Sequence, residues 1–155
     1  FERATKNTDR VMAMTDHLSG EHQLVNMAVS FTQKHGHLLL SHVEDEQTYA
    51  RYINTIAKIP TIDTDVAREQ ILKQPLKEPV DYIDSCLQVL AEHHVNIKTE
   101  SIVRTGHHLS TYRQLINDHK IDLLVLNTKD QDQLAMHGLA YPLAVEMRTT
   151  QLLLL

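Results

Sequence analysis

The stretch Ile121–Asn127 constrains the fold of this chain more than any other segment. It holds five apolar residues interrupted by one acid, and it lies between a helical pattern and a polar loop. A nearly continuous apolar run of this length predicts a strand that is buried on both faces, as in a parallel sheet. Ligands of open α/β sheets bind where such strands end, so Asn127 and Thr128 are candidate ligand contacts.

The remaining chain alternates between strand and helix patterns. Strands are predicted over residues 11–14, 38–43, 95–103, 121–127 and 151–155, and helices over 20–35, 49–59 and 80–93, from about 110 onward, and near residue 142. Gly36 is expected to close the first helix. Because of Pro75 and Pro79, we expect a loop over 61–79 with one helical piece around 65–73, and Pro79 as the first residue of the next helix. This alternation predicts an α/β fold, a doubly wound open sheet of five mostly parallel strands with helices on both faces.

At 155 residues the chain is expected to form one domain, residues 10–155, preceded by a polar linker or leader over 1–9. The start at Phe1 rather than Met suggests a domain cut from a longer protein, or a processed chain. A net charge of −5 without a local cluster of basic residues argues against a nucleic-acid partner. The single cysteine, Cys86, is compatible with a reducing compartment. No apolar stretch approaches the ~20 residues that span a bilayer, and we expect a cytoplasmic location.

Eleven histidines are a high number, and several are near neighbours: His35 and His37, His93 and His94, and His107 and His108. Adjacent residues on a helix or strand point in different directions, and no third ligand is spaced to join any pair. We therefore expect surface histidines rather than a metal site. His107 and His108 lie at the mouth of the predicted crevice, because they follow Gly106.

No catalytic motif is present. Response-regulator chemistry needs two acids together after the first strand, whereas residues 15–17 are Thr-Asp-His. Flavin-binding turns of the flavodoxin type are missing, and no serine has the context of a nucleophile elbow. We therefore expect a protein that is not an enzyme.

Four segments in this order resemble the universal stress protein family, of the adenine-nucleotide alpha-hydrolase-like fold. They are Val11–Asp16 followed by Ser19-Gly-Glu, Leu38–Val43 followed by Glu-Asp, Ile102–Gly106, and Ile121–Leu126. The resemblance covers residues 9 to 155. It implies that Asp16 and Val43 occupy positions that contact adenine and ribose, and that Gly106 lines the ribose–phosphate side.

In nucleotide-binding members, the fourth segment enters a loop with Gly, two residues, Gly, nine residues, then Gly and Ser or Thr. Those glycines let backbone amides close on phosphates. Here Asn127 and Asp130 replace the first two glycines, and Ala140-Tyr141 replace the last step unless Gly138-Leu139 serve in a shorter loop. The predicted crevice therefore comprises Asp16, Val43, Gly106, Asn127, Thr128 and Gly138.

The resemblance and its departures together predict a non-enzymatic regulatory or stress-response module without a cofactor. The alternative is an adenine-nucleotide-binding member of the family, for ATP, AMP or a cyclic nucleotide. Family members commonly pair their last strand across a two-fold axis, so we expect a homodimer through Gln151–Leu155. Such domains also occur appended to membrane transporters and signalling proteins, which makes a parent transporter a possible partner.

Overall fold

The computed structural model describes residues 8–15, 22–61, 64–128 and 139–155. Five strands and five helices are assigned within these ranges, in an order that alternates as the sequence predicts. They are β1 Arg10–Met14, α1 His22–Phe31, β2 His37–Asp45, α2 Glu46–Ile56, α3 Thr64–Glu92, β3 Lys98–Gly106, α4 His108–Asp118, β4 Leu123–Leu126, α5 Ala140–Glu146 and β5 Gln151–Leu154.

The strands form one five-stranded sheet in the order β3-β2-β1-β4-β5, and every pair is parallel. β1 lies at the centre, with β2 on one side and β4 on the other. The chain therefore winds away from β1 in both directions, which defines the doubly wound fold and places the switch point between β1 and β4. All four residues of β4 are buried, as the apolar run at 121–127 predicts.

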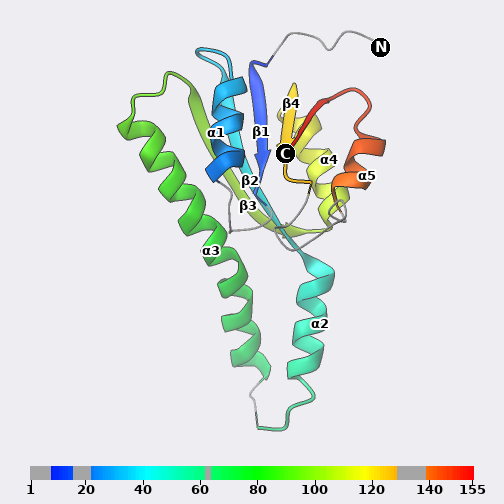
Figure 1. The fold of residues 1–155 in the computed structure, drawn as a ribbon. Helices are drawn as coiled ribbons and strands as arrows, with labels where there is room; N and C mark the ends of the chain where they lie inside the picture. The colour runs from blue at the N-terminus through cyan, green and yellow to red at the C-terminus, as the bar shows by residue number, and fades with distance from the viewer. Residues whose placement is uncertain (1–7, 16–21, 62–63, 129–138) are drawn as a thin grey trace.

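Helices cover both faces of the sheet (Figure 1), and an apolar cluster lies on each face. One cluster joins the sheet to α4 and α5, and its centre includes Met12, Tyr112 and Leu143. The other joins the sheet to α1 and α3 around Leu24 and Ile83. Because side chains alternate along a strand, successive residues of β1 contribute to opposite clusters, and the sheet is buried on both faces.

The expected loop over 61–79 is wrong, because α3 runs continuously from Thr64 to Glu92 through Pro75 and Pro79. A proline inside a helix removes one backbone hydrogen bond and costs about 3 kcal/mol or more, which is the reason to end the helix there from sequence. Pro79 is buried in the structure, and Ile83 one turn later is fully buried. Burial of this part of α3 therefore offsets the lost bonds. Figure 1 shows α2 and the first half of α3 extending beyond the sheet as a helical hairpin.

The connection from α1 to β2 also differs from expectation. α1 ends at Phe31, and the residue in the left-handed region is His35 (φ 67°) rather than Gly36. Gly36 serves a different purpose, since a Cβ there would lie 2.8 Å from the carbonyl oxygens of both Asp9 and Gln33. A side chain at residue 36 would therefore push apart the segments that precede β1 and β2.

Within the ranges that the structure describes, no helix is long and apolar enough to cross a membrane.

Candidate functional site

The structure places the described candidate residues along the carboxyl edge of the sheet. Val43 lies near the end of β2, Gly106 ends β3, and Asn127 and Thr128 follow β4 directly. Because all strands are parallel, these ends meet at one edge, as the sequence predicts. Asp16 and Gly138 lie outside the described residues.

The ladder between β1 and β2 opens at this edge. The Thr15 amide donates to the Ser41 carbonyl at 2.9 Å, and a regular parallel ladder would next bring the Val43 amide to the Thr15 carbonyl. Instead, the Val43 amide donates to the Tyr112 hydroxyl at 3.1 Å. The Thr15 carbonyl is contacted by Nδ1 of His42. Two backbone groups that would pair with each other are thus each held by a side chain.

Tyr112 and His42 are both buried, and sequence reasoning assigned neither to the site. Tyr112 is fully buried on α4, and His42 is 6% exposed. Nδ1 of His42 carries a hydrogen, because a carbonyl oxygen can only accept, and its Nε2 lies 3.5 Å from Oε2 of Glu44. The sequence did contain a signal that could have identified these two residues. A tyrosine on an apolar helix face and a histidine inside an apolar strand each need a polar partner when they are buried.

β2 and β3 end side by side at the mouth of the predicted crevice. Asp45 pairs with Gly106 in the strand register, and it caps the N-terminus of α2. Partial burial alone would raise the pKa of the Asp45 carboxyl, but the Thr48 hydroxyl, the amides of Thr48 and Gln47, and the charge of His108 together hold this pKa below its usual value. Asp45 is therefore a carboxylate near neutral pH, facing the start of α4.

Gly106 packs against that same helix. A Cβ at residue 106 would lie 2.5 Å from Oγ1 of Thr111 and 3.5 Å from its Cβ. The Thr111 hydroxyl can rotate away, so the requirement for glycine is weaker here than at Gly36.

The residues after β4 are tied to the terminal strand. The Leu155 amide donates to the Leu126 carbonyl at 3.0 Å, and the Leu155 carbonyl accepts from the Thr128 amide at 2.8 Å. The Thr128 hydroxyl donates to the same carbonyl at 2.6 Å. The first two residues of the predicted phosphate loop therefore continue the ladder between β4 and β5.

One cationic group lies close to the crevice. Arg104 pairs with Val43 in the register of β2 and β3. Its Nε atom is buried and, within the part of the chain that the structure describes, has no hydrogen-bond partner.

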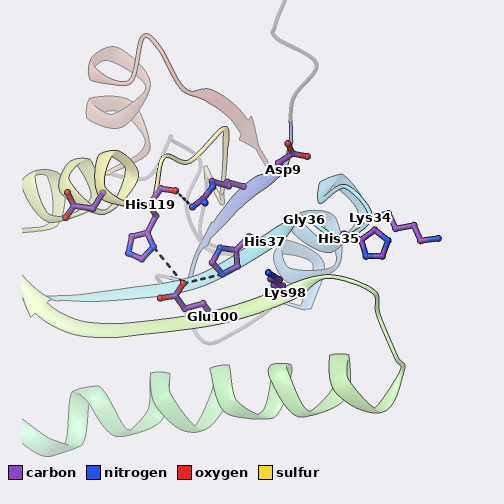
Figure 2. A pocket seen from close by; sticks show the side chains of 10 residues that line it. Asp9, Lys34, His35, Gly36, His37, Lys98, Glu100 and His119 are labelled. Carbon is purple, nitrogen blue, oxygen red and sulfur yellow. Dashed lines mark hydrogen bonds and ion pairs between the residues drawn. The ribbon is translucent and has the colours of Figure 1, made fainter.

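A hollow lies at the opposite, amino edge of the sheet. Its volume is about 700 Å³, and charged and histidine side chains line it (Figure 2). His37 and His119 point toward Glu100, with their Nε2 and Nδ1 atoms 3.2 and 3.8 Å from its Oε2, whereas Lys34 and His35 point away. Among the described residues, no three histidine, cysteine or acidic side chains are arranged to hold a metal ion.

The topology and the site define the class of the protein. The five-stranded parallel sheet in the order β3-β2-β1-β4-β5, with the candidate residues at its carboxyl edge, makes this a doubly wound α/β protein. A sequence profile of the universal stress protein family matches residues 7–138, and the chain belongs to this family. No curated protein matches the sequence.

Solved structures share the fold at low sequence identity. The hypothetical protein MJ0577 superposes with a TM-score of 0.74 at 14% identity, covering 96% of this chain and 95% of that one. The universal stress protein UspA from Lactobacillus plantarum gives 0.69 at 16% identity, with 94% and 95% covered. A universal stress protein in complex with cAMP gives 0.54 at 16% identity, with 94% of each chain covered. At such identities these likenesses concern the fold alone.

Proposed function

We propose that this protein is a non-enzymatic regulatory module of the universal stress protein type that does not hold the phosphates of ATP in the usual way. The observation that carries the proposal is the position of Thr128. Both its amide and its hydroxyl donate to the Leu155 carbonyl, at 2.8 and 2.6 Å. Two donors at the start of the predicted phosphate loop are thereby committed to the terminal strand.

The loop sequence supports the same proposal. Asp130 stands where nucleotide-binding members have a glycine, although it lies outside the described residues. Two like charges ~4 Å apart repel by about 4 kcal/mol at an effective dielectric constant of 20. That energy corresponds to roughly three orders of magnitude in affinity. A carboxylate at this position therefore opposes a triphosphate, and the lost glycine also limits close approach of backbone amides.

Thermal unfolding with added nucleotide tests the proposal. Because a ligand at 100 times its dissociation constant stabilises the folded state by about 2.7 kcal/mol, a true ATP binder shows a clear rise in melting temperature. We expect no rise for the wild-type protein with ATP. We expect Asp130→Gly to gain affinity for ATP, and Asp130→Asn, which removes the charge alone, to recover part of that gain. A wild-type protein strongly stabilised by ATP would overturn the proposal.

A second candidate function is binding of an adenine nucleotide with fewer phosphate charges, AMP or a cyclic nucleotide. Arg104 favours it: its buried Nε has no hydrogen-bond partner among the described residues, and this donor, on a residue paired with Val43, suits a single phosphate. One structure with this fold is described as a complex with cAMP. Tighter binding of AMP or cAMP than of adenosine, lost in Arg104→Gln, would support this candidate. Equal binding of all three ligands would dismiss it.

We also propose that the module is a homodimer in which β5 pairs with β5 of a second copy. β5 is an edge strand, Leu154 is 40% exposed, and the rest of the strand is half-buried. An apolar edge strand is a template for pairing with another chain. Light scattering should show a dimer that Leu154→Lys converts to a monomer, while Val89→Lys on the exposed face of α3 leaves it intact. A monomeric wild type would contradict the dimer.

A cytoplasmic location and attachment to a parent membrane transporter remain parts of the proposal that only the family resemblance supports.

A further inference from the structure

The open end of the β1–β2 ladder presents a backbone donor next to a backbone acceptor. The Val43 N–H and the Thr15 C=O would pair with each other in a regular parallel ladder, since the Thr15 amide already bonds to the Ser41 carbonyl. They lie at the carboxyl ends of β1 and β2, and β1 borders the switch point, near which ligands of open α/β sheets bind.

Both backbone groups are occupied from within the chain. The Tyr112 hydroxyl accepts from the Val43 amide at 3.1 Å, and His42 Nδ1 donates to the Thr15 carbonyl. A planar heterocycle with a ring-nitrogen acceptor beside an amino donor, such as the edge of a purine base, would offer these two backbone groups the same two kinds of bond. The two side chains thus stand in for the edge of a base.

Of the two side chains, Tyr112 is the one whose ring would stand in the way of a base. It is fully buried and packs in the cluster that includes Val43, Met14 and Leu139. A base that reached the Val43 amide would have to displace the phenol oxygen and meet the ring behind it. Burying the amide without any acceptor is unfavourable, so the phenol also satisfies a group that an empty crevice would leave unpaired.

We propose that the Tyr112 side chain occupies the position where a base would bind, and that it thereby determines whether the crevice admits a purine-like heterocycle. This inference rests on the proposed function, because it describes the base end of the same crevice whose phosphate end departs from the binding pattern. It predicts that shortening Tyr112 opens the crevice to a base without any change to the phosphate loop.

The test is calorimetric titration of adenosine into the wild-type protein, Tyr112→Leu and Tyr112→Phe. Leucine keeps the site apolar while it replaces the whole phenol group with a smaller branched side chain. We therefore expect this variant to bind adenosine about tenfold more tightly, a factor that corresponds to about 1.4 kcal/mol. Phenylalanine removes only the oxygen and keeps the ring, so we expect a smaller gain. If the leucine variant fails to fold, the phenylalanine variant decides the outcome.

Tyr82→Leu is the matched control, because Tyr82 on α3 packs in the cluster on the other face of the sheet. It should leave adenosine affinity unchanged. Affinity that is unchanged or reduced in the folded Tyr112 variants, including no binding by any of them, would overturn the proposal. Adenosine carries no phosphate, so its affinity reports on the base end of the crevice alone, and this test can fail while the proposal for the phosphate loop holds.

Discussion

Replacing Thr128 with valine tests whether the Thr128 hydroxyl stabilises the fold or binds a ligand. The Thr128 hydroxyl donates to the Leu155 carbonyl at 2.6 Å, and the Thr128 amide donates to the same oxygen at 2.8 Å. Valine has nearly the same shape and the same stiffness at its branched Cβ, so the variant removes one hydrogen bond and little else.

The expected loss of stability depends on the hydrogen bonds that remain in the Thr128→Val variant. A typical intramolecular hydrogen bond contributes about 0.5 to 1.5 kcal/mol of net stability. The Leu155 carbonyl keeps the backbone bond, so it is not left unpaired, and the loss should fall in the lower half of that range. For a domain of about 150 residues, each kcal/mol shifts the melting temperature by about 2 to 4 °C. We therefore expect the midpoint of Thr128→Val to fall by about 1 to 4 °C.

The assay is thermal and urea unfolding followed by circular dichroism, with amide hydrogen exchange to locate the effect. Exchange should quicken in β5 and at the end of β4, and leave β2 and β3 unchanged. Thr99→Val, at an exposed position near the start of β3, controls for the substitution itself. If Thr128→Val keeps full stability but loses affinity for a nucleotide, the hydroxyl serves a ligand and the reasoning is refuted.

Three further predictions concern fold and assembly. Gly36→Ala should destabilise the protein by about 1 to 3 kcal/mol in urea unfolding, because its Cβ would lie 2.8 Å from two backbone oxygens; full stability would show that the backbone there yields easily. Asp45→Ala should cost about 1 kcal/mol at pH 7 through the lost helix cap. Folding lowers the pKa of Asp45, so its ionic contribution is present above the unfolded-state pKa and is lost as the pH falls through the folded-state pKa. The difference in stability between the two proteins should therefore begin to shrink only below pH 3.8, the usual pKa of aspartate; a difference that does not shrink in acid would contradict this sign. Leu154→Lys should convert a dimer to a monomer in light scattering without lowering the helix content, and a dimer that survives it would place the interface elsewhere.

The sequence predicted the sheet well because its signals are local. The apolar run at 121–127 requires burial on both faces, and alternating strand and helix patterns leave few topologies besides a doubly wound sheet. Parallel pairing and a ligand edge that carries Asn127 follow from those two facts, whereas Val43 and Gly106 became candidates only through the family resemblance. The family resemblance then rests on the same segments.

What the sequence could not predict depends on contacts between distant residues. Tyr112 and Val43 are 69 positions apart, and no pattern in either segment predicts the hydrogen bond between them. The helix through Pro75 and Pro79 was missed for a related reason, since local propensity opposes it and burial further along α3 overrides that propensity. Likewise, the left-handed residue is His35, and Gly36 is needed for a different reason, the close approach of the distant Asp9 carbonyl.

The most direct test of the central claim is the ratio of the dissociation constants of adenosine and ATP for the wild-type protein, measured by calorimetry in one buffer. If the phosphate end of the crevice has lost its anion-binding function, the triphosphate adds nothing, and ATP should bind no more tightly than adenosine. ATP that binds about 100-fold more tightly, a difference of about 2.8 kcal/mol, would contradict the account.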